Sequence, residues 1–174
     1  MKFLSEPDSI DATRNRLFKE LNESPESPLY ERMSATSSAP GRLSLVPFQA
    51  AIDPLLNGDI LGQFTYDDKK KLLINFLSAV EASLEKMEGK SSRLTTSAFF
   101  QAIFKIFDKV CHLSIMHNKN YSLTSMSKIM DGIVGVDLSR HTGSNQAAIN
   151  ELAAEMSTLL ELHSQKLGTP SDLL

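Results

Sequence analysis

The histidines and the single cysteine are the residues of this chain best suited to acid–base, nucleophilic or metal chemistry. His112 and His117 stand five positions apart in a segment with helical periodicity. Metal-binding histidines on a helix prefer a spacing of four, which places both rings on one face. A spacing of five turns the second ring away by about 140°, and no acidic residue lies between these two histidines. The spacing argues against a metal site, and we expect no metal and no cofactor.

Cys111 directly precedes His112, and neighbours on a helix do not face each other. The pair is therefore poorly placed to act as a nucleophile and its base. A single cysteine also excludes an internal disulfide and a zinc site of the usual kind. We predict that Cys111 is a small buried hydrophobic residue in a reducing compartment.

The beginning of the chain, "MKFLSEPDSID", lacks the apolar run of a signal peptide. No stretch approaches the roughly 18 apolar residues of a membrane helix. The sequence therefore predicts a cytoplasmic protein that does not cross a membrane.

Two short loops resemble ligand-binding motifs. "DGIVGVD" (131–137) lacks the lysine of a phosphate-binding loop and the acid spacing of a calcium loop. "SRHTGS" (139–144) holds an arginine, a histidine and hydroxyls just before a predicted helix, where anions bind well. The alternative for this second loop is an ordinary turn whose serine caps the helix, and we favour that alternative.

The charge of the chain is unevenly distributed, although its net value is only −3. Residues 1–64 carry 6 basic and 9 acidic side chains, and residues 131–174 carry 2 and 6. The middle, residues 65–130, carries 10 basic and 6 acidic side chains. This basic middle fits a polyanion such as DNA, whereas the alternative is a set of solvated helix faces that balance one another.

The basic residues can contact phosphates only if several converge on one side of the fold. The candidates for nucleic-acid contact are Lys69, Lys70, Lys71, Lys86, Lys90, Arg93 and Arg140. No nucleophile or acid–base constellation can be assembled from the sequence, so we predict that the protein is not an enzyme.

The elements that position these residues are predicted to be helices. Strand signals are nearly absent, and helical periodicity is strong from residue 65 onward. We predict an all-α fold, a compact bundle of five or six helices in one domain. Its parts are a first helix (8–22), a connector (23–43), a helical bundle (44–167) and a tail (168–174).

The bundle is predicted to surround a central Phe-rich helix. This helix starts near Thr95 or Thr96 and reads "SAFFQAIFKIFDKVCHLSIM", which is apolar nearly all round. Before it, Thr65 and Gly89 bound the most strongly periodic helix. After it, helices are predicted from about Ser122 to Val134 and from Ser144 to about Lys166.

The order of several segments resembles a known family. They are "LNESPESPLYERM" (21–33), "GRLSLVPFQAAIDPLL" (41–56), "LTTSAFFQAIFKIF" (94–107) and "TGSNQAAINELAAEM" (142–156). Together they resemble the C-terminal part of DGQHR-type proteins, a family that includes the DndB regulators linked to DNA phosphorothioate modification. The resemblance spans roughly residues 10–165, and none of its motifs is catalytic.

The signature that names this family, Asp-Gly-Gln-His-Arg in an upstream ParB-like α/β part, does not occur in this sequence. The resemblance therefore implies the helical C-terminal portion alone, with a missing N-terminal α/β domain as one possible partner. It also implies that residues 21–48 form an ordered connector, with Leu29 and Tyr30 packed onto the bundle. A disordered linker stays an alternative for residues 34–40.

These observations predict a non-enzymatic helical module of a DNA-modification or defence-associated regulator, which contacts DNA or a partner protein. The alternative is a protein–protein interaction module, such as an adaptor or a bacterial effector domain, with no role on nucleic acid. A continuous basic surface would favour DNA. Scattered lysines around an exposed apolar patch would favour a protein partner.

Overall fold

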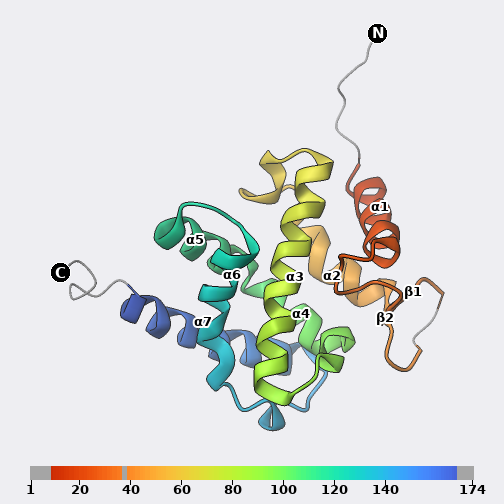
Figure 1. The fold of residues 1–174 in the computed structure, drawn as a ribbon. Helices are drawn as coiled ribbons and strands as arrows, with labels where there is room; N and C mark the ends of the chain where they lie inside the picture. The colour runs from red at the N-terminus through yellow and green to blue at the C-terminus, as the bar shows by residue number, and fades with distance from the viewer. Residues whose placement is uncertain (1–8, 37–38, 168–174) are drawn as a thin grey trace.

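The structure, a computed structural model, describes residues 9–36 and 39–167 (Figure 1). The predicted tail, residues 168–174, lies outside the described residues. Within them the chain forms seven α-helices and one short parallel ladder, so the predicted all-α class is confirmed. The helices are α1 Ile10–Glu23, α2 Leu45–Leu56, α3 Tyr66–Glu88, α4 Ser97–Lys105, α5 Phe107–Asn118, α6 Leu123–Met130 and α7 Gln146–Leu167. None of the described helices combines the length and apolar character needed to cross a membrane.

The connector after α1 is ordered by local hydrogen bonds. Ser27 Oγ accepts from the Leu29 amide at 3.0 Å, and the Asn22 side chain accepts from the Met33 amide at 3.1 Å. The chain then forms the ladder between β1 (Met33–Ser34) and β2 (Leu43–Ser44). Leu29 is fully buried as expected, but Tyr30 is exposed, because it lies on the outer side of this turn. Of the linker alternative (34–40), residues 37 and 38 lie outside the described part.

Helix α3 follows its sequence signals closely. Thr65 Oγ1 accepts from the Asp68 amide at 3.3 Å, which caps the first turn. Gly89 ends the helix in the left-handed conformation (φ 77°), which glycine adopts without steric cost. The local chemistry of these two residues fixes both ends of the longest helix.

Phenylalanine rings connect the core across helices. The rings of Phe48, Phe76, Phe100, Phe104 and Phe107 form consecutive contacts with centroids 4.9–6.0 Å apart. Such pairs add about 0.5–1.5 kcal/mol beyond the area they bury. The Phe-rich segment therefore lies at the centre of the core, as predicted.

The prediction of one continuous Phe-rich helix is wrong, because the segment breaks at Ile106 into α4 and α5. Ile106 leaves the helical range (φ −101°, ψ 3°), and its amide donates to the Ile103 carbonyl at 3.2 Å. An apolar surface on all sides cannot be covered easily along one straight axis. The break lets α4 pack against α2 and α7, and α5 against α6 and α7 (Figure 1). This break raises the helix number from the predicted five or six to seven.

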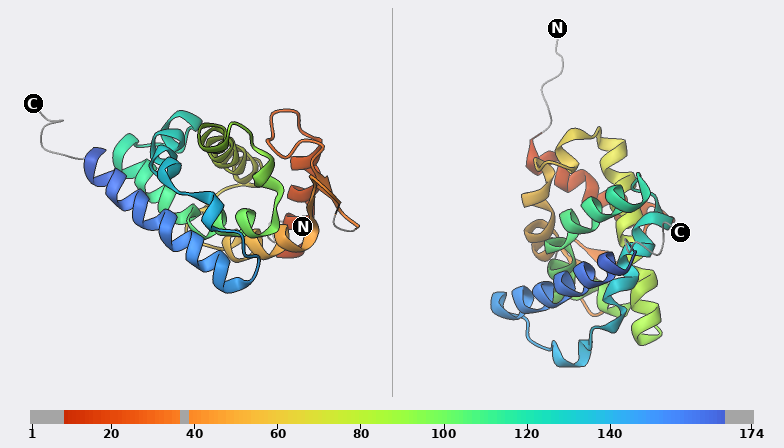
Figure 2. Two further views of the ribbon diagram at one scale, coloured as in Figure 1. Left: turned by 90° about the horizontal axis from the view of Figure 1, so that it is seen from below. Right: turned by 90° about the vertical axis from the view of Figure 1, so that its left-hand side faces the viewer.

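Two later boundaries also differ from the sequence prediction. The helix predicted to reach Val134 ends at Met130 and continues as a 3₁₀ helix, η3 (Asp131–Gly135). Helix α7 is capped by Asn145, whose side chain accepts from the Ala148 amide at 2.8 Å, and not by Ser144. Helix α7 then crosses α4, α5 and α6 along one side of the molecule (Figure 2).

Candidate anion-binding site

The predicted basic residues do not form one face, because α3 separates them. Lys69, Lys70 and Lys71 lie in its first turns, whereas Lys86 lies in its last turn and Lys90 and Arg93 follow its end. A helix of 23 residues is about 35 Å long. The two groups are therefore separate surfaces, and the continuous basic surface that would favour DNA is not formed by the predicted residues as a set.

The lysines at the N-terminal end of α3 are occupied by neighbours. Lys69 Nζ donates to the Phe64 carbonyl at 2.5 Å, and Lys70 Nζ lies 3.4 Å from Glu20 Oε1 on α1. Glu20 also pairs with Arg16 at 3.0 Å. Lys71 is exposed. The charges at this end therefore serve mainly to join α1 to α3.

Positive charge at the C-terminal end of α3 is partly free. Lys86 Nζ lies 2.7 Å from Asp131 Oδ1. Lys90 is exposed, and among the described residues no ion pair includes it. Arg140 is exposed at the end of the 3₁₀ helix η4 (Leu138–Arg140) and does not line the pocket described next.

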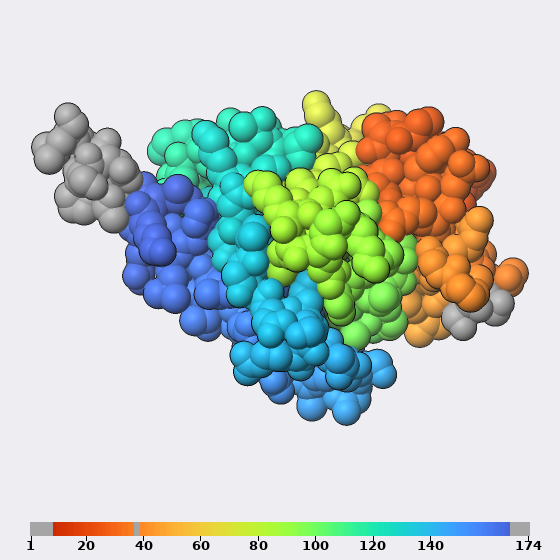
Figure 3. Space-filling model, turned by 60° about the horizontal axis from the view of Figure 1, so that its bottom comes forward, coloured from red at the N-terminus to blue at the C-terminus, as the bar shows by residue number. Residues whose placement is uncertain are grey.

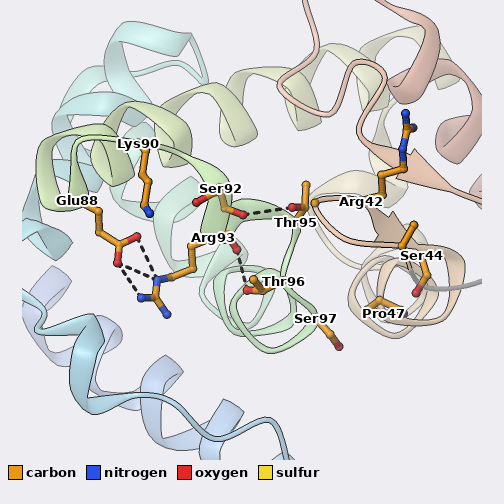
Figure 4. A pocket seen from close by; sticks show the side chains of 12 residues that line it. Arg42, Ser44, Pro47, Glu88, Lys90, Ser92, Arg93, Thr95, Thr96 and Ser97 are labelled. Carbon is orange, nitrogen blue, oxygen red and sulfur yellow. Dashed lines mark hydrogen bonds and ion pairs between the residues drawn. The ribbon is translucent and has the colours of Figure 1, made fainter.

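Lys90 and Arg93 line a surface pocket of about 590 Å³, together with Arg42 from the connector. We call it the cationic pocket. Its polar lining consists of Arg42, Ser44, Glu88, Lys90, Ser92, Arg93, Thr95, Thr96 and Ser97. Figure 4 shows Glu88, Lys90 and Arg93 on one side and Arg42, Ser44 and Pro47 on the other, with Ser92, Thr95, Thr96 and Ser97 between them.

Local structure explains how these side chains come together. The Leu43 amide donates to the Arg32 carbonyl at 2.8 Å, and Arg42 Nη1 donates to the Met33 carbonyl at 3.2 Å. The ladder between β1 and β2 therefore brings Arg42 to the pocket. On the opposite side, fully buried Leu94 anchors the 3₁₀ helix η2 (Ser92–Thr95), which carries Arg93.

Two helices begin at the cationic pocket without a side-chain cap. Thr96 is at the N-cap of α4, but its hydroxyl donates to the Arg93 carbonyl at 2.7 Å. Ser44 is at the N-cap of α2 and makes no capping hydrogen bond. The first amides of a helix carry partial positive charge. The pocket lining contains three cationic side chains and one carboxylate. The two helix N-termini add to the positive potential of these cations.

Glu88 is that carboxylate, and it holds Arg93 in place. Arg93 Nη2 donates to Glu88 Oε1 at 2.7 Å, and Arg93 Nε donates to both carboxylate oxygens at 3.1 and 3.2 Å. The hydrogen bonds from Arg93 lower the pKa of Glu88. An anion that reaches Arg93 must compete with Glu88, whereas Lys90 has no such competitor.

The structure separates the candidate residues for metal or nucleophilic chemistry. His117 Nε2 lies 2.8 Å from Ser164 Oγ, whereas His112 is exposed. Cys111 is fully buried, and this burial raises the pKa of its thiol. In residues 9–36 and 39–167 there is no group of three or more His, Cys, Asp or Glu side chains placed to hold a metal ion.

The side chains and amides of the "SRHTGS" loop (139–144) bind neighbouring residues of the protein. His141 Nε2 lies 2.9 Å from Glu155 Oε1, and Asp137 accepts from the Ser139 amide at 3.1 Å. The fold nevertheless brings this loop beside Arg93, Thr96 and Ser97. Figure 3 shows the segment after η3 projecting next to the C-terminal end of α3.

Sequence reasoning identified Lys90 and Arg93 but missed Arg42. Arg42 lies in a segment read as connector, and only the pairing of β1 with β2 brings it to the pocket. The residues Thr96 and Ser97 were read as a helix start and not as part of a site.

The chain matches no protein-family model, and neither a curated protein nor a solved structure is significantly similar to it. The resemblance to DGQHR-type proteins thus stays a prediction from the quoted segments.

Proposed function

We propose that this chain is a non-enzymatic helical module that contacts the phosphate backbone of DNA through the cationic pocket. The observation that carries the proposal is that Arg42, Lys90 and Arg93 line one pocket although they come from segments far apart in the sequence. The Arg42 guanidinium donates to the Met33 carbonyl and points away from the other two cations (Figure 4), so it must turn to share a phosphate with them. Arginine, lysine, serine and threonine side chains and helix N-termini are the groups that contact phosphate oxygens in protein–DNA complexes. All of these groups line this pocket.

The regulatory context is also a proposal. The resemblance to DGQHR-type proteins supports a module of a DNA-modification or defence-associated regulator. In such a protein the pocket would position the module on DNA without reading its sequence, because phosphate contacts carry no direct sequence information. Sequence specificity would then come from a partner, for example an N-terminal α/β domain.

The test is binding of the purified chain to a short labelled duplex at about 50 and 200 mM salt. Two to three phosphate contacts predict that affinity falls about 12- to 40-fold across this range. Changing both Arg42 and Lys90 to glutamate should lower the salt slope by about two. The matched control is Lys71→Glu, which reverses an exposed charge at the far end of α3.

Binding that is unchanged in the Arg42→Glu, Lys90→Glu variant would contradict the proposal. So would binding that the Lys71→Glu control reduces equally, since it would then depend on overall charge and not on the pocket. Circular dichroism of each variant shows whether the fold is kept.

A second candidate function is supported by a groove at the other end of α3. It measures about 590 Å³ and is lined by the apolar residues Phe64, Leu72, Tyr121 and Leu123. Leu123 is 45% exposed, and the Phe64 and Tyr121 rings meet edge to face at 6.1 Å. Such a groove fits an apolar segment of a partner protein.

The groove has its own test. If the chain is a protein-interaction module, Leu123→Asp should abolish binding of a purified partner, while the Arg42→Glu, Lys90→Glu variant should bind normally. The opposite result would assign the partner to the cationic pocket. Absence of DNA binding at low salt would favour this second function.

A further inference from the structure

A second pocket adjoins the cationic pocket on the other side of Arg93. It measures about 230 Å³ and shares Arg93, Thr96 and Ser97 with the first. Its far wall is formed by the loop from His141 to Ser144 and by the first turns of α7. The "SRHTGS" loop, for which the sequence favours an ordinary turn over an anion site, thus contributes to a pocket beside the cations.

The chemistry of this second pocket differs from that of the first. Its inner surface is apolar and comes from Ala98, Phe99, Ala148, Ile149 and Leu152. Hydroxyl groups lie at its edge, on exposed Thr142 and Ser144. Its volume is below the roughly 300 Å³ at which pockets for drug-sized ligands begin. The pocket therefore suits a small, neutral group with polar edges.

One of its two ionisable side chains is already engaged. The His141 ring pairs with Glu155 at 2.9 Å and is nearly buried, so it does not offer a charge to a ligand. Arg93 is the other, and it stands at the boundary between the two pockets. A ligand that fills both pockets must therefore carry its negative charge at one end only.

We infer that the two pockets together bind one unpaired nucleotide of a DNA strand. Lys90 and Arg93 hold its phosphate, and its base enters the apolar pocket between α4 and α7. A base in a duplex is stacked and paired, so only an unpaired base can enter such a pocket. This inference rests on the proposed contact with DNA and specifies the form of DNA.

The experiment compares a short thymidine oligonucleotide with an abasic strand of equal length and charge. Enclosure of a base contributes about fivefold or more in affinity. We expect the thymidine strand to bind at least about fivefold tighter than the abasic strand. Two variants fill the apolar pocket from opposite sides, Ala148→Met and Ala98→Leu. Each should lower the affinity for the thymidine strand to that for the abasic strand, and leave abasic binding unchanged.

The matched control is Ala147→Met, at an exposed position next to Ala148 that does not line the pocket. It should keep the full preference for the thymidine strand. Thermal melting of all three variants shows that each is folded.

The outcomes separate this inference from the proposed function. If both strands bind equally with steep salt dependence, the cationic pocket contacts DNA but the nucleotide inference is wrong. It is also wrong if both folded pocket-filling variants retain the preference. If neither strand nor a duplex binds at low salt, the proposed function itself fails.

Discussion

The two ends of helix α3 are similar in composition and different in use. At the N-terminal end, Lys69 donates to the Phe64 carbonyl, and Lys70 forms an ion pair with Glu20. These two lysines therefore contact other parts of the protein and are not free to bind a ligand. At the C-terminal end, Lys90 is exposed, unpaired among the described residues and close to Arg93. Each end therefore keeps one exposed lysine outside the ion pairs of the described residues, Lys71 or Lys90, but only Lys90 lines a pocket together with two arginines.

The comparison shows that the acceptors around a cation decide whether it joins parts of the fold or stays open to a ligand. The N-terminal end faces α1, which supplies Glu20 as an acceptor, and Arg16 stacks on Tyr66 at 3.7 Å. The C-terminal end faces the connector, which supplies Arg42 and no carboxylate to the pocket. Like charges around the cationic pocket raise the local potential because Glu88 is the one carboxylate in its lining, whereas Asp131 at the same end pairs with Lys86.

The largest expected effect comes from reversing the charges at the N-terminal end. Changing Lys69, Lys70 and Lys71 together to glutamate places acids beside Glu20, and should lower the free energy of unfolding by about 1–2 kcal/mol. Duplex affinity should stay within about twofold, because this end lies beyond a Debye length of about 10 Å from the cationic pocket. Urea denaturation and a binding titration measure the two effects. A large loss of duplex affinity with no change in the free energy of unfolding would show that the N-terminal end of α3 also binds DNA, and that the two ends do not differ in function.

Removing the Glu88 carboxylate, which competes with an anion for Arg93, should have a smaller effect and should strengthen a property of the protein, its affinity for DNA. Glu88→Gln releases Arg93 from its carboxylate partner, and should tighten duplex binding about two- to fivefold at low salt. The control is Glu85→Gln, which lies one turn earlier on the exposed side of α3. Equal gains in both variants would show a general charge effect. Fluorescence anisotropy at fixed salt distinguishes the two results.

Acid should weaken both ends to a similar, modest extent. Hydrogen bonds from Arg16 and Arg93 lower the pKa values of Glu20 and Glu88 in the folded protein. Each carboxylate therefore stabilises the fold above its unfolded pKa of about 4.3, and this contribution disappears as the pH falls through the folded value. Each contributes about 0.5 kcal/mol.

The corresponding measurement is the free energy of unfolding from pH 6 down to about pH 3. Glu20→Gln and Glu88→Gln should each flatten the loss of stability at low pH. A pH profile in either variant that is as steep as in the unaltered protein would show that the carboxylate does not stabilise the fold.

The smallest expected effect concerns Tyr66 at the N-terminal end. Within the described residues, its hydroxyl is shielded from water and makes no hydrogen bond of standard geometry. Burial, with the nearby Glu20 carboxylate, raises the pKa of this phenol. Tyr66→Phe should leave the free energy of unfolding unchanged or raise it slightly, by less than about 0.5 kcal/mol, because no hydrogen bond is lost and a shielded hydroxyl without a partner is removed. A loss above about 1 kcal/mol would reveal a bond from the hydroxyl to Glu20 in solution.

Features set by local chemistry were predicted well from the sequence. Thr65 and Gly89 bound their helix as expected, because capping depends on residues within one turn. The break at Ile106 was not predictable, because it depends on which helices cover the Phe-rich segment. At the start of α7 two neighbouring residues, Ser144 and Asn145, can both cap a helix, and the sequence does not decide between them.

The site was predictable only in part. Lys90 and Arg93 were recognised as basic residues, but their separation from Lys69–Lys71 follows from the length of one helix. Arg42 reaches the pocket through a two-residue ladder that carries no clear strand signal. Its contribution could be found only from the tertiary structure.

The position of α7 against α4 has a consequence for how the protein is made. Leu152 follows Arg93 by 59 positions, so a ribosome adding about 5–20 residues per second needs about 3–12 s between them. During that interval the nascent chain holds both sides of the cationic pocket, while the face of α4 that α7 covers stays open to chaperones. All residues that line the cationic pocket are thus synthesised before the α7 side of the apolar pocket.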